Sequence, residues 1–381
     1  MNILIVASPV VTLRRPFKGG TESFIVRLAN RLTEMGHTVD VLALDADETD
    51  NFQTLLLEES PFSMKDAIHS EEWGQKIYKA MQFSLMSMSQ YDVIHFNSYL
   101  PLLYDLAAMR KIPSVVTLHT PVDNRFSLLH KLHSRRDRDV RYVAVSERLK
   151  LDWEANISTA ITVIPNGIDP IDQNFSEEKR DGLIWVGRLC EEKNPIDAIK
   201  LARLTNEKLT LFGPIDQQKY FDQKIKPELD DQISYRGHVS CEELYSELGK
   251  SRFMIASALW QEPFGLSILE ALSAGTSIIG YASAVPPELR HKDCVSIASK
   301  QCVHELCRRY QEIRCRLDTA ANSAELAKEH ASKFSLNDTA ERYIKIYHDV
   351  TEKRNNPNNN ILRPSSWQRT PSTVSPLGRS S

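Results

Sequence analysis

The segment that decides the fold is residues 2–44, NILIVASPVVTLRRPFKGGTESFIVRLANRLTEMGHTVDVLAL. Residues 2–7 are apolar from Ile3 to Ala7, which is typical of a parallel strand covered on both faces. Apolar side chains then recur at the helical period over residues 22–35, and Gly36 stands where a C-terminal cap belongs. Residues 37–44 are again strand-like. The segment therefore predicts a β-α-β unit, and such units build parallel sheets.

The rest of the chain continues this alternation in two series. The first has strand-like runs at residues 91–96, 113–118, 141–145 and 162–164. The second has them at 183–186, 208–212, 233–236, 253–256 and 277–280, with helical segments at 195–204, 241–250 and 266–274. The two series part near residues 166–181. We therefore expect an α/β chain of two doubly wound domains that bind their ligand in the cleft at the carboxyl ends of the strands.

Length and composition agree with two globular domains. The chain has 381 residues, 41% hydrophobic and 25% charged, and a domain averages roughly 150 residues. The formal net charge of −3 gives no global basic field for nucleic acid. No apolar run reaches the roughly 20 residues of a membrane-spanning helix, and the first residues lack the basic start and cleavage site of a signal peptide. We therefore expect a cytoplasmic protein.

The cysteines and two charged or polar segments of the chain have simple structural interpretations. The six cysteines form no CxxC pair or zinc-finger spacing, which favours reduced thiols, and residues 302–315 are typical of an amphipathic helix. Residues 125–141 are rich in Arg and Lys; they could meet an anionic membrane at its inner face, but a solvated helical face is the simpler interpretation. Residues 352–381 are rich in Asn, Pro, Ser and Arg, and we expect a disordered polar tail.

Two glycines, Gly19 and Gly20, lie between the first predicted strand and the first predicted helix. Glycine lets a ligand approach the backbone, and a helix N-terminus offers unpaired N–H groups and the positive end of a dipole. The pair therefore suits an anion such as a phosphate group, although a plain tight turn explains it equally well. The dinucleotide fingerprint GxGxxG and the P-loop GxxxxGK[ST] are both absent, which disfavours a nicotinamide oxidoreductase.

A charged loop, residues 187–194, follows the first strand of the second series. The guanidinium of Arg188 can bond two phosphate oxygens at once, and Lys193 adds a mobile positive charge. A solvated loop is the simpler interpretation of such a sequence. Its position at the carboxyl end of a strand favours ligand binding instead.

Two glutamates, Glu262 and Glu270, flank the start of a predicted helix. Eight helical steps would already separate them by about 12 Å, whereas the two carboxylates of a retaining glycosidase lie about 5 Å apart. They are therefore not expected to act on one bond. They could bind two ends of one long ligand, such as the sugar and the ribose of a nucleotide sugar, or they could be surface acids near a helix N-terminus.

Histidines end two predicted strands of the first domain. His119 follows the strand at 113–118, and its position at the carboxyl end faces the predicted cleft. His95 lies in the strand at 91–96. A single histidine is more often structural than functional, and we expect a functional role for His119 rather than for His95.

Taken together, these motifs resemble those of the retaining GT-B glycosyltransferases of family 4. The resemblance covers roughly residues 1–350 and rests on the order and spacing of several short motifs. They are GGTE at 19–22, IPNGID at 164–169, GR at 187–188, EKN at 192–194, the stretch from Glu262 to Glu270, AGT at 274–276 and FSLNDTAERYIKIY at 334–347.

The resemblance implies an architecture as well as a reaction. It implies a GT-B fold, in which two Rossmann-like domains face a central cleft and a C-terminal helix crosses back to the first domain. The implied divisions are an acceptor domain at 1–168, a nucleotide-sugar donor domain at 169–332, the crossover helix at 333–350 and the polar tail at 352–381. The departure from the family is the loop at 282–288, which lacks the small Gly-rich stretch that similar enzymes often carry.

The resemblance also assigns roles to residues. Arg188 and Lys193 would hold the donor diphosphate near Gly19 and Gly20, and Glu270 would bind the ribose hydroxyls. His119 would lie beside the reacting sugar. The donor sugar would be held by Glu262 and the backbone N–H groups of Phe264, Gly265 and Leu266, and the base would lie against the turn of Gly237, His238 and Val239.

The implied activity is hexosyl transfer with retention, from a UDP- or GDP-linked sugar to a hydroxyl of a glycan, glycolipid or small-molecule acceptor. No metal or other cofactor is implied, and no nucleic-acid partner. Acceptor specificity would lie in the first-domain loops at 45–75 and 121–138. Two alternatives stay open at this point: a sugar-nucleotide epimerase of the same fold, and a catalytically inactive GT-B module that serves as a scaffold.

Overall fold

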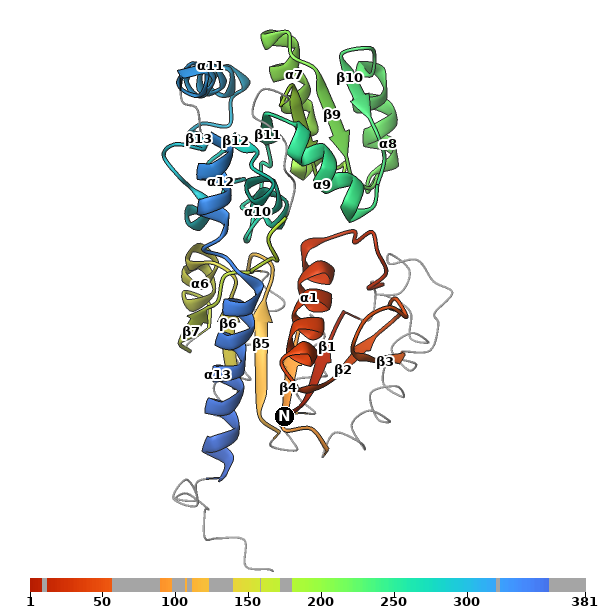
Figure 1. Ribbon diagram of the computed structural model, residues 1–381, viewed down its shortest axis with the longest axis vertical. Coiled ribbons are helices and arrows are strands. Elements are labelled where there is room, and N and C mark those ends of the chain that lie inside the picture. The colour runs from red at the N-terminus through yellow and green to blue at the C-terminus, as the bar shows by residue number, and fades with distance from the viewer. Residues whose placement is uncertain are drawn as a thin grey trace, which may run out of the picture.

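The computed structural model contains two sheets, one in each half of the chain (Figure 1). The structure describes residues 1–8, 12–56, 90–97, 107, 112–122, 140–157, 159–171, 180–319 and 323–355. All strand pairs within these residues are parallel, as the predicted β-α-β units require.

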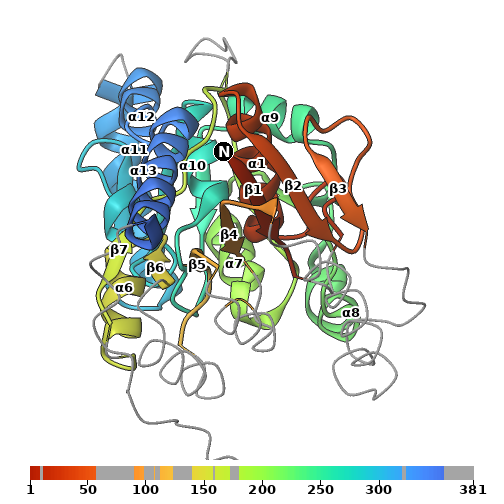
Figure 2. The same cartoon turned by 90° about the horizontal axis from the view of Figure 1, so that it is seen from below.

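The first sheet has the strand order β3-β2-β1-β4-β5-β6-β7, which Figure 2 shows from right to left. Its interior strand β1 is apolar on both faces from Ile3 onward, and Ile3 lies opposite Val39 of β2 and Val93 of β4. The strands are β1 (Asn2–Val6), β2 (Thr38–Ala43), β3 (Gln53–Leu56), β4 (Val93–Phe96), β5 (Ser114–Leu118), β6 (Val140–Ala144) and β7 (Ile161–Val163).

The second sheet repeats this plan with the order β10-β9-β8-β11-β12-β13. As in the first sheet, the order reverses beside the first strand of the series, which is where doubly wound sheets bind their ligands. The strands are β8 (Leu183–Val186), β9 (Leu209–Phe212), β10 (Ile233–Tyr235), β11 (Phe253–Ala256), β12 (Ser277–Tyr281) and β13 (Val295–Ala298).

Amphipathic helices cover the two sheets. In α1, Phe24, Ile25, Leu28 and Leu32 are buried, as the helical period of the sequence predicts. The α-helices are α1 (Gly20–Glu34), α6 (Glu147–Glu154), α7 (Pro195–Thr205), α8 (Gln218–Tyr220), α9 (Cys241–Lys250), α10 (Leu266–Ser273), α11 (Val303–Thr319), α12 (Ser323–Ala331) and α13 (Leu336–Asn355). Shorter turns are η3 (Glu191–Lys193), η4 (Phe221–Ile225), η5 (Lys226–Glu228) and η6 (Pro287–Leu289).

The C-terminal helix α13 returns to the first domain, which confirms the expected crossover (Figure 1). It packs against α1 and against β4, β5 and β6, and buries Tyr343 and Tyr347. The linker between the domains touches the start of this helix, because Ile168 pairs with Ser335. A Cβ atom at Gly167 would lie 2.2 Å from the Ser335 carbonyl oxygen, so this close approach requires glycine.

The structure corrects several details of the sequence interpretation. Residues 53–56 form edge strand β3, although we expected the whole stretch 45–75 to be an acceptor loop. Strand β13 and helix α12 were not predicted. Helix α13 extends to Asn355, so residues 352–355 are helical rather than part of the tail. The rest of the expected tail, most of the basic stretch at 125–141 and most of the loop at 121–138 lie outside the described residues.

Candidate active site

A cavity of about 510 Å³ lies between the two domains, and both contribute to its walls. The first domain supplies the loop before α1, the first turn of α1 and the end of β5. The second supplies the ends of β8 and β9, the start of α9, and α10 with the loop that precedes it. Apart from Gly237, which was expected beside the base, the residues predicted for the site all line this cavity: Gly19, Gly20, His119, Arg188, Lys193, His238, Val239, Glu262, Phe264, Gly265, Leu266 and Glu270.

The N-terminus of α1 opens into the cavity through Gly19 and Gly20. Gly19 is the N-cap residue with an extended backbone, and its missing side chain leaves room for the carboxylate of Glu22, which lies 2.7 Å from where a Cβ atom would be. Glu22 is buried, and this burial raises the pKa of its carboxyl group, while Arg188 and Lys18 act in the opposite direction. An acidic side chain therefore lies at the expected anion site.

Arg188 lies between two carboxylates at the end of β8. Its Nη1 donates to Asp216 Oδ2 at 2.8 Å, and its Nη2 donates to Glu192 Oε1 at 2.6 Å. Burial acts to lower the pKa of the guanidinium, but Asp216, Cys190 and Glu192 together outweigh it, and the pKa is raised. The side chain is thus held as a cation on the cavity wall by partners that remain partly exposed.

Lys193 and Glu262 both line the cavity and form an ion pair there. Lys193 Nζ donates to Glu262 Oε2 at 2.6 Å, and the indole N–H of Trp260 donates to the same oxygen at 2.8 Å. The ammonium also lies 4.7 Å from the centre of the Trp260 ring, within range of a cation–π interaction. The family resemblance assigns these two charges to different parts of a ligand, whereas in the structure they pair with each other.

The start of α10 presents backbone N–H groups to the cavity. Gly265 is its N-cap residue with φ +81°, a left-handed conformation that favours glycine, and no side chain caps the helix. Phe264, Gly265 and Leu266 line the cavity here, and the N–H groups at the start of a helix have no acceptor within the helix. Glu270 follows one turn later, and its Oε1 accepts from Arg27 Nη2 at 2.5 Å.

The two histidines of the first sheet have different environments. His119 lines the cavity, and its Nε2 lies 2.8 Å from Asn97 Oδ1. Because a carbonyl oxygen only accepts, Nε2 carries the proton. His95 is buried below it, bonded to Thr117 and Tyr347, and does not line the cavity. Burial lowers the pKa of each imidazole to about 3, so both rings are neutral at pH 7.

The turn that was predicted to contact a base joins the two domains. Gly237 has φ +84°, and His238 Nε2 bonds to the carbonyl oxygen of Phe17 in the first domain at 3.0 Å. Val239 follows it on the cavity wall, packed against the core. The divergent loop at 282–288 supports the domain contact as well, since Arg148 of α6 donates to the carbonyl oxygens of Ala282 and Ser283.

Several site residues escaped the sequence analysis because their partners are distant in sequence. Arg27 and Tyr245 contact Glu270, Asn97 contacts His119, and Trp260 contacts Glu262. One signal was available for Arg27: it lies seven residues after Gly20, two helical turns along the same face of α1.

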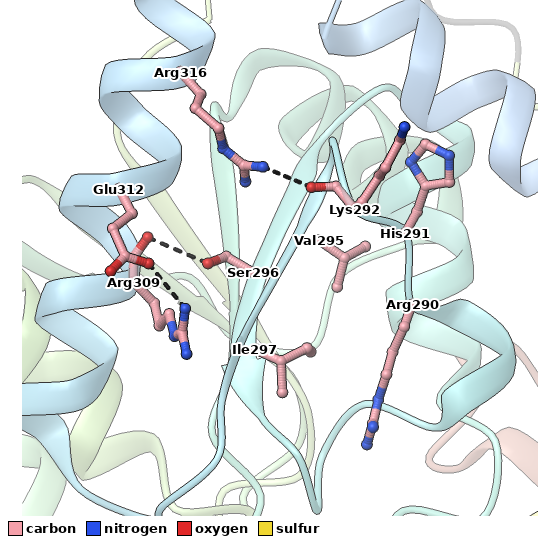
Figure 3. A pocket seen from close by; sticks show the side chains of 9 residues that line it. All are labelled: Arg290, His291, Lys292, Val295, Ser296, Ile297, Arg309, Glu312 and Arg316. Atoms are coloured by element: carbon pink, nitrogen blue, oxygen red, sulfur yellow. Dashed lines mark hydrogen bonds and ion pairs between the residues drawn. The ribbon is translucent and has the colours of Figure 1, made fainter.

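A second pocket of about 550 Å³ lies between α11 and β13 (Figure 3). It contains none of the predicted site residues, and several of its cations are bound to protein atoms. Arg309 pairs with Glu312, Arg316 donates to the Lys292 carbonyl oxygen, and Arg290 donates to the Ala282 carbonyl oxygen. Across the described residues, no three His, Cys, Asp or Glu side chains are placed to hold a metal ion. No described helix is both long and apolar enough to span a membrane.

Comparison with known sequences gives two consecutive family matches. Residues 18–171 match Glycosyltransferase Family 4, and residues 169–294 match Glycosyl transferases group 1. An uncharacterised glycosyltransferase of Methanocaldococcus jannaschii is 25% identical over 300 residues, 68% of this chain and 76% of the relative. A phosphatidyl-myo-inositol mannosyltransferase of Mycolicibacterium smegmatis is 21% identical over 282 residues, 68% of this chain and 72% of the relative.

Solved structures show the same two-domain fold. Sucrose-phosphate synthase from Thermosynechococcus elongatus superposes with a TM-score of 0.75 at 16% sequence identity. The superposition covers 92% of this chain and 99% of the synthase chain. Anabaena HepE in complex with UDP-glucose superposes with a TM-score of 0.70 at 16% sequence identity. The superposition covers 93% of this chain and 99% of the HepE chain. At this level of identity the likeness shows the fold.

Proposed function

The chain belongs to the group 1 glycosyltransferases of family 4 and has the GT-B fold, and we propose that it moves a hexose from a UDP- or GDP-linked sugar to a hydroxyl group with retention of configuration. The observation that carries this proposal is one cavity between the domains, which is lined by residues of several family motifs, from Gly19 through Arg188 to Glu262 and Glu270. Anabaena HepE, which shares the fold, binds UDP-glucose, and this supports a nucleotide sugar as the donor.

In the proposed complex, the donor diphosphate lies between the N-terminus of α1 and the side chains of Arg188 and Lys193. These groups supply two positive charges and the positive end of a helix dipole to a leaving group that gains negative charge. Glu22 would have to leave the anion site or bind a proton there. Lys193 would exchange part of its contact with Glu262 for the phosphate.

The sugar would lie against the start of α10, with Glu262 and the amides of Phe264, Gly265 and Leu266 as hydrogen-bond partners for its hydroxyls. His119 would be a neutral partner beside the reacting carbon, because its ring is uncharged and Asn97 fixes Nε2. Glu270 would accept from the ribose hydroxyls, and the base would lie against His238 and Val239. Fixed donors and acceptors of this kind hold both reactants in one orientation.

The proposed reaction breaks the bond between the anomeric carbon and the diphosphate oxygen and forms a bond from the same carbon, on the same face, to the acceptor oxygen. The acceptor proton passes to the leaving phosphate oxygen, so charge and atoms balance. The acceptor would be a glycan, a glycolipid or a small molecule bound on the side of the first domain. We infer that Arg188 and Lys193 provide the charge compensation, so that the transfer rate should be unchanged by EDTA.

Thermal unfolding with nucleotides tests the donor site. UDP, GDP, ADP, TDP and their common sugars would each be added to the purified chain, and a nucleotide at 100 times its Kd stabilises by about 2.7 kcal/mol. We expect a rise in Tm with one nucleotide series that is lost in Arg188→Ala and Glu270→Ala. Arg203→Ala is the matched control, because Arg203 is equally exposed and pairs with Asp230 away from the cavity. An unchanged Tm with every nucleotide would overturn the proposed donor site.

A further inference from the structure

An ion pair between the two domains, Arg27 with Glu270, includes the carboxylate that is proposed to bind the ribose. Arg27 of α1 donates from Nη2 to Glu270 Oε1 of α10 at 2.5 Å and to the Tyr245 hydroxyl of α9 at 2.6 Å. The Tyr245 hydroxyl lies 3.3 Å from the same carboxylate oxygen. Figure 1 shows α1 directly below α9 and α10, so one side chain of the first domain links two helices of the second.

This contact is largely withdrawn from solvent. The side chain of Arg27 is 17% exposed and that of Glu270 is 13% exposed. Burial acts to lower the pKa of Arg27, but the charge of Glu270, together with smaller contributions from Tyr245 and Cys241, outweighs it, and the pKa is raised. A partly buried charge pair of this kind depends strongly on its geometry, because either partner alone would be left desolvated without compensation.

The pair uses only one oxygen of the carboxylate. Arg27 and Tyr245 both bond to Oε1, whereas no described protein group donates to Oε2, and Glu270 lines the cavity. The side chain is therefore fixed at one oxygen and open at the other. A carboxylate held in this way presents its second oxygen in a defined direction, at little further cost in side-chain entropy.

We propose that Arg27 is a positioning residue for recognition of the donor ribose: it orients Glu270 so that Oε2 accepts from the ribose hydroxyls, and does so only when the two domains are closed. The inference rests on the proposed function, since Glu270 is the ribose partner there. It adds that ribose recognition is assembled from both domains. The first domain thus contributes to donor specificity through α1, in addition to the anion site at its N-terminus.

Arg31 offers a matched control on the same helix. It lies one turn after Arg27 and also reaches beyond the first domain, with Nη2 2.7 Å from Asp169 Oδ1 and a further bond to Asn337. Arg31, Asp169 and Asn337 do not line the cavity. Loss of Arg31 therefore removes an ion pair to the interdomain linker without touching the donor site.

Binding of ribose and deoxyribose nucleotides tests the inference. Dissociation constants would be measured by calorimetry for UDP against 2′-deoxy-UDP, and for GDP against 2′-deoxy-GDP. A hydrogen bond to a charged group gives a preference of about 10-fold or more for the ribose form in the unaltered chain. We expect this preference to fall to about 3-fold or less in Arg27→Ala and to persist in Arg27→Lys and Arg31→Ala. In a Glu270→Gln background, Arg27→Ala should change the preference no further.

The outcomes separate the inference from the proposed function. If the unaltered chain binds none of these nucleotides, the proposed function fails. If it binds them without distinguishing ribose from deoxyribose, or if Arg27→Ala keeps the full preference, the inference is overturned. Should Arg27→Ala fail to fold, Tyr245→Phe takes its place: this variant removes one bond to Glu270 Oε1, and an unreduced ribose preference in it would count equally against the inference.

Discussion

The ammonium of Lys193 lies 2.6 Å from a carboxylate oxygen of Glu262, and the indole N–H of Trp260 donates to that same oxygen. Both charged side chains are less than one-fifth exposed. The pair closes the cavity wall between the loop after β8 and the loop before α10. In the proposed complex these two residues bind neighbouring parts of the donor, so the ligand must compete with the pair for each of them.

Removal of the Lys193 charge should impair the chemical step. We expect Lys193→Ala to lower the transfer rate by about 100-fold or more, because one cation beside the leaving diphosphate is lost and Glu262 loses its cationic partner. Lys200→Ala is the control, since Lys200 is exposed and pairs with Asp197 outside the cavity. Initial rates at saturating donor would measure the effect, and equal rates in both variants would contradict the role of Lys193.

Arg188 provides a test of geometry as well as charge. Asp216 and Glu192 orient its guanidinium, and a guanidinium can bond two phosphate oxygens where an ammonium acts as a point charge. We expect Arg188→Ala to reduce kcat/KM by on the order of 100-fold or more, and Arg188→Lys to recover only part of that loss. Steady-state kinetics with Arg203→Ala as control would measure both. Full recovery by lysine would show that charge alone suffices.

Long strands and capped helices were predictable because local sequence decides them. Residues 3–7 are apolar throughout, and Gly36 ends its helix in the left-handed conformation, as the sequence analysis expected of a cap. Strands β3 (QTLL) and β13 (VSIA) were missed because polar residues interrupt the apolar run in each. Pairing with β2 and β12 fixes them as edge strands, and this information is not local.

The residues that line the cavity were predictable for a similar reason. The hydrogen bonds and ion pairs between these residues were not predictable. Gly19, Arg188 and Glu262 follow strands or precede helices, and the carboxyl ends of parallel strands meet at one edge. The partner of each charged group depends on how the two domains close on each other. Arg27 and Glu270 are 243 residues apart, and no periodicity relates them. Sequence reasoning therefore finds the site residues before it finds the pairs that hold them.

Cys241 offers a chemical probe of the cavity. Its thiol lines the cavity at the start of α9, and burial raises its pKa, so little thiolate exists at neutral pH. At pH 9 we expect iodoacetamide to modify Cys241 slowly, and a saturating nucleoside diphosphate to reduce that rate by about 10-fold or more at 100 times its Kd. Peptide mass spectrometry would follow each cysteine separately.

The exposed thiols Cys302 and Cys315 are internal controls in the same sample, since neither lines the cavity. Their modification rates should not depend on the nucleotide. Equal protection of all three thiols would indicate a general stabilisation of the fold, and no protection of Cys241 would place the nucleotide elsewhere.

Acid should destabilise the first domain through its buried histidines. The pKa of His95 and that of His119 are lowered to about 3 by burial, against an ordinary value near 6.5 in the unfolded chain. Above pH 6.5 both rings are neutral in either state, and their contribution to stability is complete. Below pH 6.5 the unfolded chain takes up protons that the folded chain cannot, so stability is lost progressively until the pH approaches 3.

Each of these histidines should contribute a slope of up to about 1.4 kcal/mol per pH unit below pH 6.5. Urea denaturation at pH 7.5, 6.5, 5.5 and 5.0 would measure the free energy of unfolding in this window, where few carboxylates titrate. We expect His95→Gln to flatten the acid slope by about that amount, because Gln binds no proton in either state. The unaltered chain is the reference. If it has the same slope as His95→Gln, His95 does not resist protonation in the folded protein, and the bonds from Thr117 and Tyr347 do not keep its ring neutral.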